Sequence, residues 1–254
     1  MKAMLAEIVR TKRAEIEALP NDAGPAEAPP LRDFAAALRR PGLSVIAEIK
    51  RRSPSAGALR DDLDAEALAR AYARGGAAAI SCLTDGPHFG ARPDDLPRAR
   101  AATTLPLLRK DFILDLRQVR QSRRLGADAV LLIARLLSVP QLTDLLAAAR
   151  ALRMAALVEV HDEAELDRAL ACGAEIIGVN NRDLDTFRVS RDTALRLRPR
   201  IPPDRIAVAE SGISRREDLL RIERCGYDAV LVGEALIRAA DPCAGLRALA
   251  GSRA

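Results

Sequence analysis

The chain has 254 residues, of which 49% are hydrophobic and 30% are charged, and its formal net charge at pH 7 is +5. This composition is typical of a folded protein with a sizeable core, and no stretch approaches the roughly 18 uninterrupted apolar residues of a membrane span. Its arginines are interspersed with acidic residues, and two Tyr, four Phe and no Trp offer little base stacking, so we expect no nucleic-acid partner and favour a small anionic one.

Two amphipathic helices are predicted ahead of the first strand, in residues 4–19 and 30–40. The first helix lacks the apolar core of a signal peptide, so we expect a cytoplasmic protein that does not bind membranes. Four widely spaced cysteines without a CxxC pair agree with this location, because they are typical of buried free thiols. The Pro- and Ala-rich segment 19–30 predicts a flexible hinge between the helices.

Eight apolar runs predict strands near residues 45, 78, 106, 129, 156, 176, 206 and 229. Four of these runs follow a glycine, at positions 76, 126, 173 and 226, that can end a helix in the left-handed conformation. Most segments between the runs have helical periodicity, and buried strands that alternate with amphipathic helices are typical of parallel sheets covered by helices. We therefore predict an α/β protein with one (β/α)8 TIM barrel domain over residues 1–254, with an open doubly wound sheet as the alternative.

Charged residues end the first, third, fifth and seventh predicted strands: Glu48 and Lys50, Lys110, Glu159, and Glu210. Only four of the 40 Lys and Arg residues are lysines. A lysine can give up a proton in a protein, whereas an arginine effectively cannot. Alternate barrel strands point their side chains into one layer, so we expect these charges to meet at one mouth and to act in general acid–base catalysis. The alternative is a rim on which the acids merely neutralise Lys50, Lys110 and Arg182.

The last two strands each end at a glycine beside a helix start, in "AESGIS" and "LVGEALI". Backbone N–H groups at such helix starts bind anions, and these two loops are the common phosphate site of the fold. Ser211, Gly212, Gly233 and Glu234 would line this site. Phe89 and Phe112 follow the second and third strands and predict a pocket for a flat ring. No GxGxxG or GxxxxGK motif is present, so we expect no nucleotide cofactor.

Six motifs in chain order resemble those of the indole-3-glycerol phosphate synthase family: "VIAEIKRRSPSAG", "LLRKDFI", "ALVEVH", "IIGVNNRDL", "VAESGI" and "VLVGEAL". The resemblance runs from about residue 2 to 248. It implies an enzyme of tryptophan biosynthesis that converts 1-(2-carboxyphenylamino)-1-deoxyribulose 5-phosphate into indole-3-glycerol phosphate by ring closure, decarboxylation and dehydration. It also implies that the reaction needs no metal or organic cofactor.

Matching positions carry the family's roles onto this sequence. Lys110 resembles the general acid that protonates the ketone and the departing hydroxyl, and Glu159 resembles the general base. Lys50 resembles the lysine that faces the substrate carboxylate, with Glu48 orienting it, and Asn180 and Arg182 resemble the groups that hold the hydroxyl and the carboxylate. The resemblance assigns the phosphate to Ser53, Ser211, Gly212, Gly233 and the turn at Glu234, and the polar base of the pocket to Glu210.

Two positions depart from the family pattern. Ala91 replaces a serine that is usual in the lid loop, and Glu234 replaces a small hydroxyl residue, so we expect only the backbone N–H of Glu234 to face the phosphate. The family's N-terminal helices lie across the barrel mouth, so we expect residues 1–43 to cover it. A cap on the opposite end of the barrel, or a dimer contact, is the alternative.

Two other functions remain open at this point. One is a sugar-phosphate isomerase such as phosphoribosylanthranilate isomerase, which needs Asp and Cys at strand ends, and the other is a catalytically silent phosphate-binding barrel. The expected partner is a phosphorylated small molecule, and the expected oligomeric state is a monomer or a weak homodimer. The two histidines, His88 and His161, carry no strong signal; His161 is expected to open a helix and His88 to lie in a loop.

Overall fold

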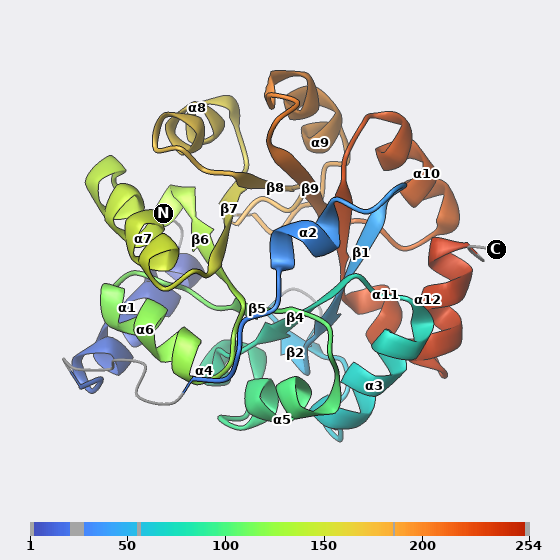
Figure 1. Cartoon of the computed structure of the whole chain (residues 1–254), viewed down its shortest axis with the longest axis horizontal. Coiled ribbons are helices and arrows are strands. Elements are labelled where there is room, and N and C mark those ends of the chain that lie inside the picture. The colour runs from blue at the N-terminus through green and yellow to red at the C-terminus, as the bar shows by residue number, and fades with distance from the viewer. Residues whose placement is uncertain (1–2, 21–27, 55–56, 185, 252–254) are drawn as a thin grey trace.

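The computed structural model describes residues 3–20, 28–54, 57–184 and 186–251, and its centre is a closed barrel of parallel strands (Figure 1). The barrel strands are β1 (Ser44–Ile49), β4 (Ala79–Leu83), β5 (Leu107–Lys110), β6 (Ala129–Ile133), β7 (Ala155–Val160), β8 (Ile176–Asn180), β9 (Ile206–Glu210) and β10 (Ala229–Val232). Each strand pairs with its neighbours in chain order, and β10 closes onto β1. The predicted (β/α)8 TIM barrel is confirmed, and the open sheet is excluded.

Helices follow the strands and surround the barrel (Figure 1). They are α3 (Ala65–Gly75), α4 (Gly86–Phe89), α5 (Asp95–Ala102), α6 (Leu116–Arg124), α7 (Val139–Ala151), α8 (Glu163–Ala171), α9 (Asp192–Leu197), α10 (Arg216–Arg224), α11 (Glu234–Ile237) and α12 (Pro242–Ala250), with short 3-10 turns η1 (Ala134–Leu136) and η2 (Arg198–Arg200). The four predicted helix-ending glycines have φ between 77° and 91°. Within the described ranges, no helix is long and apolar enough to cross a membrane.

Side chains alternate between the inside and the outside of the barrel along each strand. In β1, for example, Val45 and Ala47 belong to the outer core between strands and helices, whereas Ile46 belongs to the inner core. Four inner-core residues are each followed two positions later by a predicted site residue: Ile46 by Glu48, Leu108 by Lys110, Leu157 by Glu159, and Val208 by Glu210. The period of two therefore aims all four charged side chains into the barrel.

The helix α2 (Phe34–Leu38) lies at the N-terminal end of the barrel, opposite the mouth, and crosses the barrel centre in Figure 1. Phe34 and Leu38 are buried in the inner core with the residues that begin β6 and β9. The adjoining Arg39 donates a hydrogen bond of 3.0 Å to the carbonyl of Asp204, just ahead of β9. The expectation that residues 1–43 cover the mouth is therefore wrong for α2. Its apolar face fits either end of a barrel, and the sequence pattern does not distinguish the ends.

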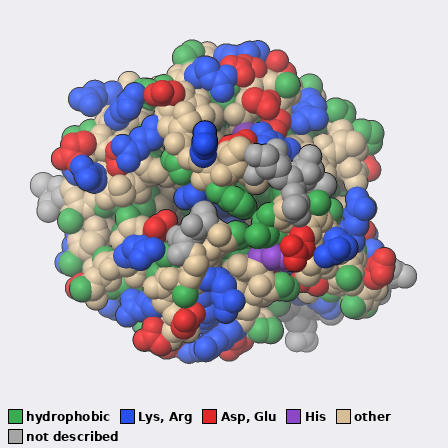
Figure 2. All heavy atoms as spheres, turned by 180° about the vertical axis from the view of Figure 1, so that it is seen from behind, with side chains coloured by type: hydrophobic (Ala, Val, Ile, Leu, Met, Phe, Trp, Pro, Cys, Tyr) green, Lys and Arg blue, Asp and Glu red, His purple; other side chains and the backbone are tan. Residues whose placement is uncertain are grey.

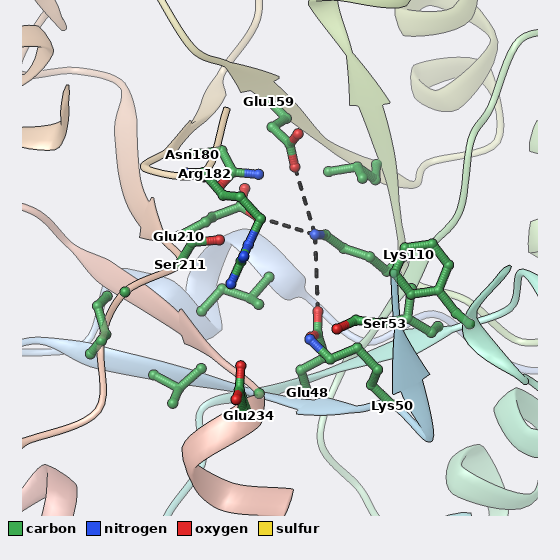
Figure 3. A pocket seen from close by; sticks show the side chains of 18 of the residues that line it. Glu48, Lys50, Ser53, Lys110, Glu159, Asn180, Arg182, Glu210, Ser211 and Glu234 are labelled. Carbon is green, nitrogen blue, oxygen red and sulfur yellow. Dashed lines mark hydrogen bonds and ion pairs between the residues drawn. The ribbon is translucent and has the colours of Figure 1, made fainter. Parts of the chain in front are cut away.

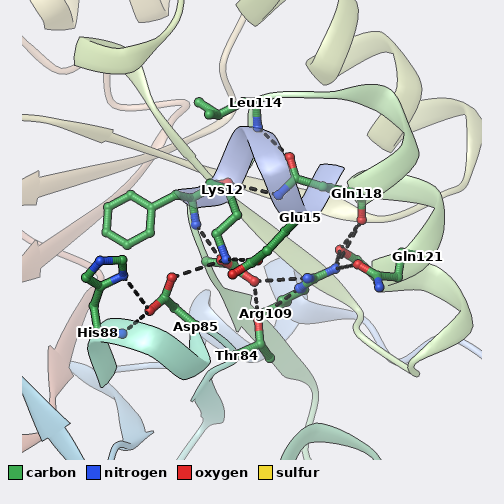
Figure 4. Close-up of polar contacts among 12 residues, drawn as sticks. Lys12, Glu15, Thr84, Asp85, His88, Arg109, Leu114, Gln118 and Gln121 are labelled. Carbon is green, nitrogen blue, oxygen red and sulfur yellow. Dashed lines mark hydrogen bonds and ion pairs between the residues drawn. The ribbon is translucent and has the colours of Figure 1, made fainter. Parts of the chain in front are cut away.

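The helix α1 (Ala3–Glu17) lies beside the C-terminal ends of β4 and β5, where one buried lysine holds it (Figure 4). Lys12 is 2% exposed, and its Nζ is 2.9 Å from Asp111 Oδ1 and 3.1 Å from Asp85 Oδ2. Burial opposes the charge, but Asp111, Glu15 and Asp85 outweigh burial and raise the pKa of Lys12 above its usual range. Because Asp111 directly follows Lys110, this ion cluster ties α1 to the strand that carries Lys110. Most of the predicted hinge, residues 21–27, lies outside the described residues.

Candidate active site

Lys110 lies among three buried glutamates at the C-terminal end of the barrel (Figure 3). Its Nζ is 3.3 Å from Glu210 Oε2 and 3.6 Å from Glu159 Oε2. The third carboxylate, Glu48 Oε2, is 3.9 Å away. Barrel closure thus brings carboxylates from β1, β7 and β9 around the ammonium group on β5, as the strand-end pattern predicted.

The three carboxylates set the charge of Lys110. Burial alone lowers the pKa of an ammonium group, but Glu210, Glu159 and Glu48 outweigh burial and raise the pKa of Lys110 above its usual range. Lys110 is therefore protonated in the free protein and has a proton to donate.

The same three carboxylates differ in their own proton affinity. Burial raises the pKa of each, but in Glu159 the charge of Lys110, with help from His161 and Asn180, outweighs burial and lowers the pKa. Lys50 and Lys110 likewise lower the pKa of Glu48. In Glu210, burial together with repulsion from Glu159 and Glu48 outweighs the attraction of Lys110, so its pKa is raised. Glu159 is thus ionised, whereas Glu210 is the first of the three to take up a proton as the pH falls.

We expect Glu210→Gln to raise the melting temperature at alkaline pH. A carboxyl group whose folded pKa lies above its ordinary value of 4.5 favours the folded state below that value, and this contribution is lost as the pH rises through the folded pKa. The amide has no charge to bury, so the gain is about 2–4 °C for each 1 kcal/mol of relief, and it shrinks toward zero as the pH falls to 4.5. Thermal unfolding of both proteins between about pH 5 and pH 9 measures it; equal melting temperatures throughout would contradict the raised pKa.

Two glycines make room for the buried carboxylates. A Cβ on Gly178, in the middle of β8, would overlap Glu210 Oε1. A Cβ on Gly233, just after β10, would lie 2.5 Å from Glu48 Oε1. A side chain at either position would displace the carboxylate beside it, so Gly233, which the sequence assigned to a phosphate, also leaves room for Glu48.

Lys50, Asn180 and Arg182 line the same cavity as Lys110 (Figure 3). Lys50 Nζ is 2.7 Å from Glu48 Oε1, and its side chain is 16% exposed at the mouth. Asn180 ends β8, and its Oδ1 accepts a 2.9 Å hydrogen bond from the backbone N–H of Arg182. These contacts orient an ammonium and an amide group at one opening, and Arg182 adds a guanidinium group to the same lining.

The cavity has a volume of about 440 Å³ and opens on the face of the molecule shown in Figure 2, where a hollow lies near the centre. The rings of Phe89 and Phe112 meet in its wall with centroids 6.1 Å apart and planes inclined by 41°. Ser53 lines the cavity from β2 (Arg52–Ser53), which pairs with β3 (Gly57–Ala58) in a hairpin that the sequence did not predict. Aromatic and aliphatic groups thus face the charged cluster across one space.

Ser211, Gly212 and Gly233 line the cavity at the ends of β9 and β10. Ser211 and Gly212 both have positive φ, at 65° and 75°. A Cβ on Gly212 would lie 2.6 Å from Val189 Cγ1, so glycine is required there for both its conformation and its size. Glu234 lies beside them, and its Oε1 is 3.2 Å from Arg238 Nε, so an arginine offsets the acid found at this position.

Sequence reasoning missed two arginines of this cavity, Arg191 and Arg238. Both lie in helical or loop segments of a chain with 40 basic residues, and no local pattern separates them from arginines on the outer surface. It also gave His161 no role, although that residue contacts Glu159. Among the side chains that the structure describes, no group of three His, Cys, Asp or Glu is placed to hold a metal ion.

A closed parallel barrel that gathers a lysine and three glutamates in one cavity at the C-terminal ends of its strands has the architecture of a (β/α)8 barrel enzyme. A family model described as indole-3-glycerol phosphate synthase matches residues 4–249. The chain belongs to the indole-3-glycerol phosphate synthase family.

Curated relatives named indole-3-glycerol phosphate synthase align with this chain over most of their length. The chain is 55% identical to indole-3-glycerol phosphate synthase 2 of Streptomyces coelicolor, over 89% of this chain and 88% of the relative. It is 51% identical to the indole-3-glycerol phosphate synthase of Albidiferax ferrireducens, over 95% of this chain and 96% of the relative. The Polaromonas naphthalenivorans protein of that name is 48% identical, over 99% of this chain and 100% of the relative.

Solved structures with low sequence identity share the fold. A thiamine phosphate pyrophosphorylase from Pyrococcus furiosus superposes with a TM-score of 0.61 at 18% identity, covering 82% of this chain and 93% of that one. A mandelate oxidase superposes with a TM-score of 0.60 at 16% identity, covering 92% and 88%. These likenesses concern the barrel alone.

Proposed function

We propose that this chain catalyses the reaction for which its family is named, the conversion of 1-(2-carboxyphenylamino)-1-deoxyribulose 5-phosphate into indole-3-glycerol phosphate, CO2 and water. The observation that carries the proposal is the cluster of Lys110 with Glu159, 3.6 Å apart in the wall of a cavity of about 440 Å³. A cavity of this size suits a small substrate with an aromatic ring.

Lys110 and Glu159 are the proposed acid and base. The ring carbon that bears the carboxylate attacks the ketone, and the Lys110 ammonium supplies a proton to the oxygen as negative charge develops there. Loss of CO2 restores the aromatic ring, and the new hydroxyl then leaves as water after a second protonation. Glu159, which is ionised in the free protein, takes the proton released as the pyrrole ring forms.

The groups around this pair hold the substrate in the proposed complex. Lys50, oriented by Glu48 at 2.7 Å, faces the substrate carboxylate and brings it toward the ketone. Arg182 shares this carboxylate, and Asn180 holds the hydroxyl that forms on ring closure. Glu210 supplies the polar base of the pocket.

The cavity lining offers both an apolar wall and groups suited to an anion. Phe89 and Phe112 form an apolar wall against which the anthranilate ring packs. The proposed phosphate-binding residues that line the same cavity are Ser53, Ser211, Gly212, Gly233 and Glu234, joined by Arg191 and Arg238. Arginine is suited to this role because its planar guanidinium group matches a phosphate bidentately.

The direct test is to incubate the purified protein with the proposed substrate and to follow indole absorbance and fluorescence. We expect both to rise, with release of one CO2 for each indole-3-glycerol phosphate formed. The same assay with phosphoribosylanthranilate tests the isomerase alternative. Turnover of that compound, without turnover of the proposed substrate, would replace the proposal with an isomerase, and turnover of neither would favour a silent barrel.

The structure offers the isomerase little support. That chemistry needs an Asp and a Cys at strand ends, and Cys82, the cysteine of β4, belongs to the outer core rather than to the cavity. Burying a lysine among three carboxylates costs free energy, which a catalytic role would explain. A catalytically silent barrel gives no reason for that cost.

A cytoplasmic location and a monomeric or weakly dimeric state belong to the same proposal. All four cysteines are free, which fits a reducing compartment. Light scattering on a size-exclusion column measures the mass in solution, and a stable assembly larger than a dimer would contradict the second part.

A further inference from the structure

His161 lies directly after β7, between two carboxylates. Its Nδ1 is 2.9 Å from Glu165 Oε2, and its Nε2 is 3.3 Å from Glu159 Oε1. The residue is 7% exposed. Nδ1 is hydrogen-bonded to Glu165, whereas Nε2 and Glu159 Oε1 are in ion-pair contact without hydrogen-bond alignment. Two carboxylates beside one buried imidazole favour its charged form. The geometry therefore favours a buried imidazolium.

Glu165, on α8, is itself held in place. Its Oε2 also accepts a 2.8 Å hydrogen bond from the backbone N–H of His161, and its Oε1 accepts a 2.7 Å hydrogen bond from Arg135 Nε. Arg135 in turn contacts Asp183 Oδ2 at 3.2 Å. A row of alternating charges thus leads from the side of the barrel into the active site: Arg135, Glu165, His161, Glu159 and Lys110.

The two oxygens of Glu159 have different cationic partners. Oε2 faces Lys110 at 3.6 Å, and Oε1 faces His161 at 3.3 Å. The other groups that act on Glu159 are the Asn180 side chain from β8, which favours its ionised form, and the carboxylates of Glu48 and Glu210 from β1 and β9, which oppose it. Without His161, Glu159 Oε1 would be buried with no cation next to it. The Glu159 side chain could then rotate or take up a proton.

We propose that His161 is a positioning residue for the reaction: as an imidazolium fixed by Glu165, it holds the Glu159 carboxylate in one orientation and keeps it ionised. This inference rests on the proposed function, in which Glu159 is the base. His161 does not line the cavity, so it acts on the substrate only through Glu159.

The balance of charge around the ring agrees with this role. Burial disfavours the imidazolium, but contacts with Glu159 and Glu165 outweigh burial and raise the pKa of His161 to about 9. His161 therefore stays charged at neutral pH, and its charge is lost only as the pH rises through that value.

The first test follows the imidazole signals of the protein by NMR between about pH 5 and pH 10. The chain has only two histidines, so a His88→Gln variant assigns both signals. We expect the His161 ring to remain an imidazolium, with protons on both nitrogens, up to about pH 9. Glu165→Gln should move the titration of His161 to lower pH, whereas Glu163→Gln, a half-buried position on the same helix that pairs with Arg196, should not. A wild-type His161 that is neutral at pH 7 overturns the proposal.

The second test compares the pH dependence of kcat/KM in His161→Gln, Glu165→Gln and the Glu163→Gln control. Loss of the neighbouring cation raises the pKa of Glu159, so the acid limb of the profile should move up by about one pH unit in His161→Gln and by less in Glu165→Gln. At pH 7 we expect kcat to fall about tenfold with KM little changed. A fall in kcat that is equal at every pH indicates a merely structural role and overturns the proposal.

The two proposals fail in different ways. If the wild-type protein does not convert the substrate, the proposed function fails, while the NMR titration still reports on the charge of His161. If the wild-type protein is active and the acid limb does not move in His161→Gln, the positioning role fails and the proposed function stands.

Discussion

Lys110→Arg is expected to lower kcat by about 10²–10⁴-fold while the protein stays folded. Arginine keeps the positive charge that faces Glu210, Glu159 and Glu48, so the cluster of carboxylates remains compensated. Its guanidinium group does not release a proton in the physiological range, so the acid needed to protonate the ketone and the departing hydroxyl is lost. Steady-state kinetics of indole formation measure the effect, and circular dichroism with thermal unfolding verifies the fold.

Lys110→Met is the matched comparison, because it removes the charge as well as the proton. If proton transfer is the role of Lys110, both variants lose activity to a similar degree, although Lys110→Met also loses stability because three buried carboxylates are left with less compensation. If charge alone matters, the arginine variant retains most of the activity. An active Lys110→Arg protein would therefore refute the proton-donor role and leave only an electrostatic one.

Glu159→Gln is expected to lower kcat by about 10²–10³-fold with a small change in KM. The amide has nearly the same shape as the carboxylate but is not a base, so substrate binding is preserved while proton removal is not. Glu159 is one of the groups that raise the pKa of Lys110, so the variant also holds the Lys110 proton less tightly. The acid limb of the pH–rate profile that reports on Glu159 should disappear.

Glu163→Gln serves again as the control for an acid-to-amide change on the neighbouring helix, since Glu163 pairs with Arg196 outside the cavity. Its kinetics should match those of the wild-type protein. A Glu159→Gln variant whose kcat stays within about threefold of the wild type would mean that another group is the base. Glu210 would then be the next candidate, because it lies 3.3 Å from Lys110 and its raised pKa suits proton exchange near neutral pH.

The N-terminal region shows where prediction from the sequence ends. The apolar spacing of residues 30–40 predicted a helix, and α2 is present within that range. The same pattern says nothing of the barrel end on which the helix packs. That choice depends on contacts with residues far along the chain, such as Asp204 and the first residues of β6 and β9.

The candidate site divides in the same way. Glu48, Lys110, Glu159 and Glu210 were predicted because each lies at the end of a strand whose inward face follows from a period of two. His161 was not, because its importance depends on a 3.3 Å contact with Glu159 and on a glutamate four residues later that holds its other nitrogen. The clearances at Gly178 and Gly233 were also hidden, since each depends on a carboxylate from a different strand.

The sequence by itself determined the barrel strands, most of the helices between them and the strand ends at which the charged residues lie, but it left a closed barrel and an open sheet as alternatives. These features follow from hydrophobic period and chain order, which are local properties. Only the tertiary structure decided the end that α2 covers, the opposite pKa shifts of Glu159 and Glu210, and the pairing of His161 with Glu159. Electrostatic energy and steric clearance change over a few ångströms, and distances on that scale between remote residues exist only after the chain has folded.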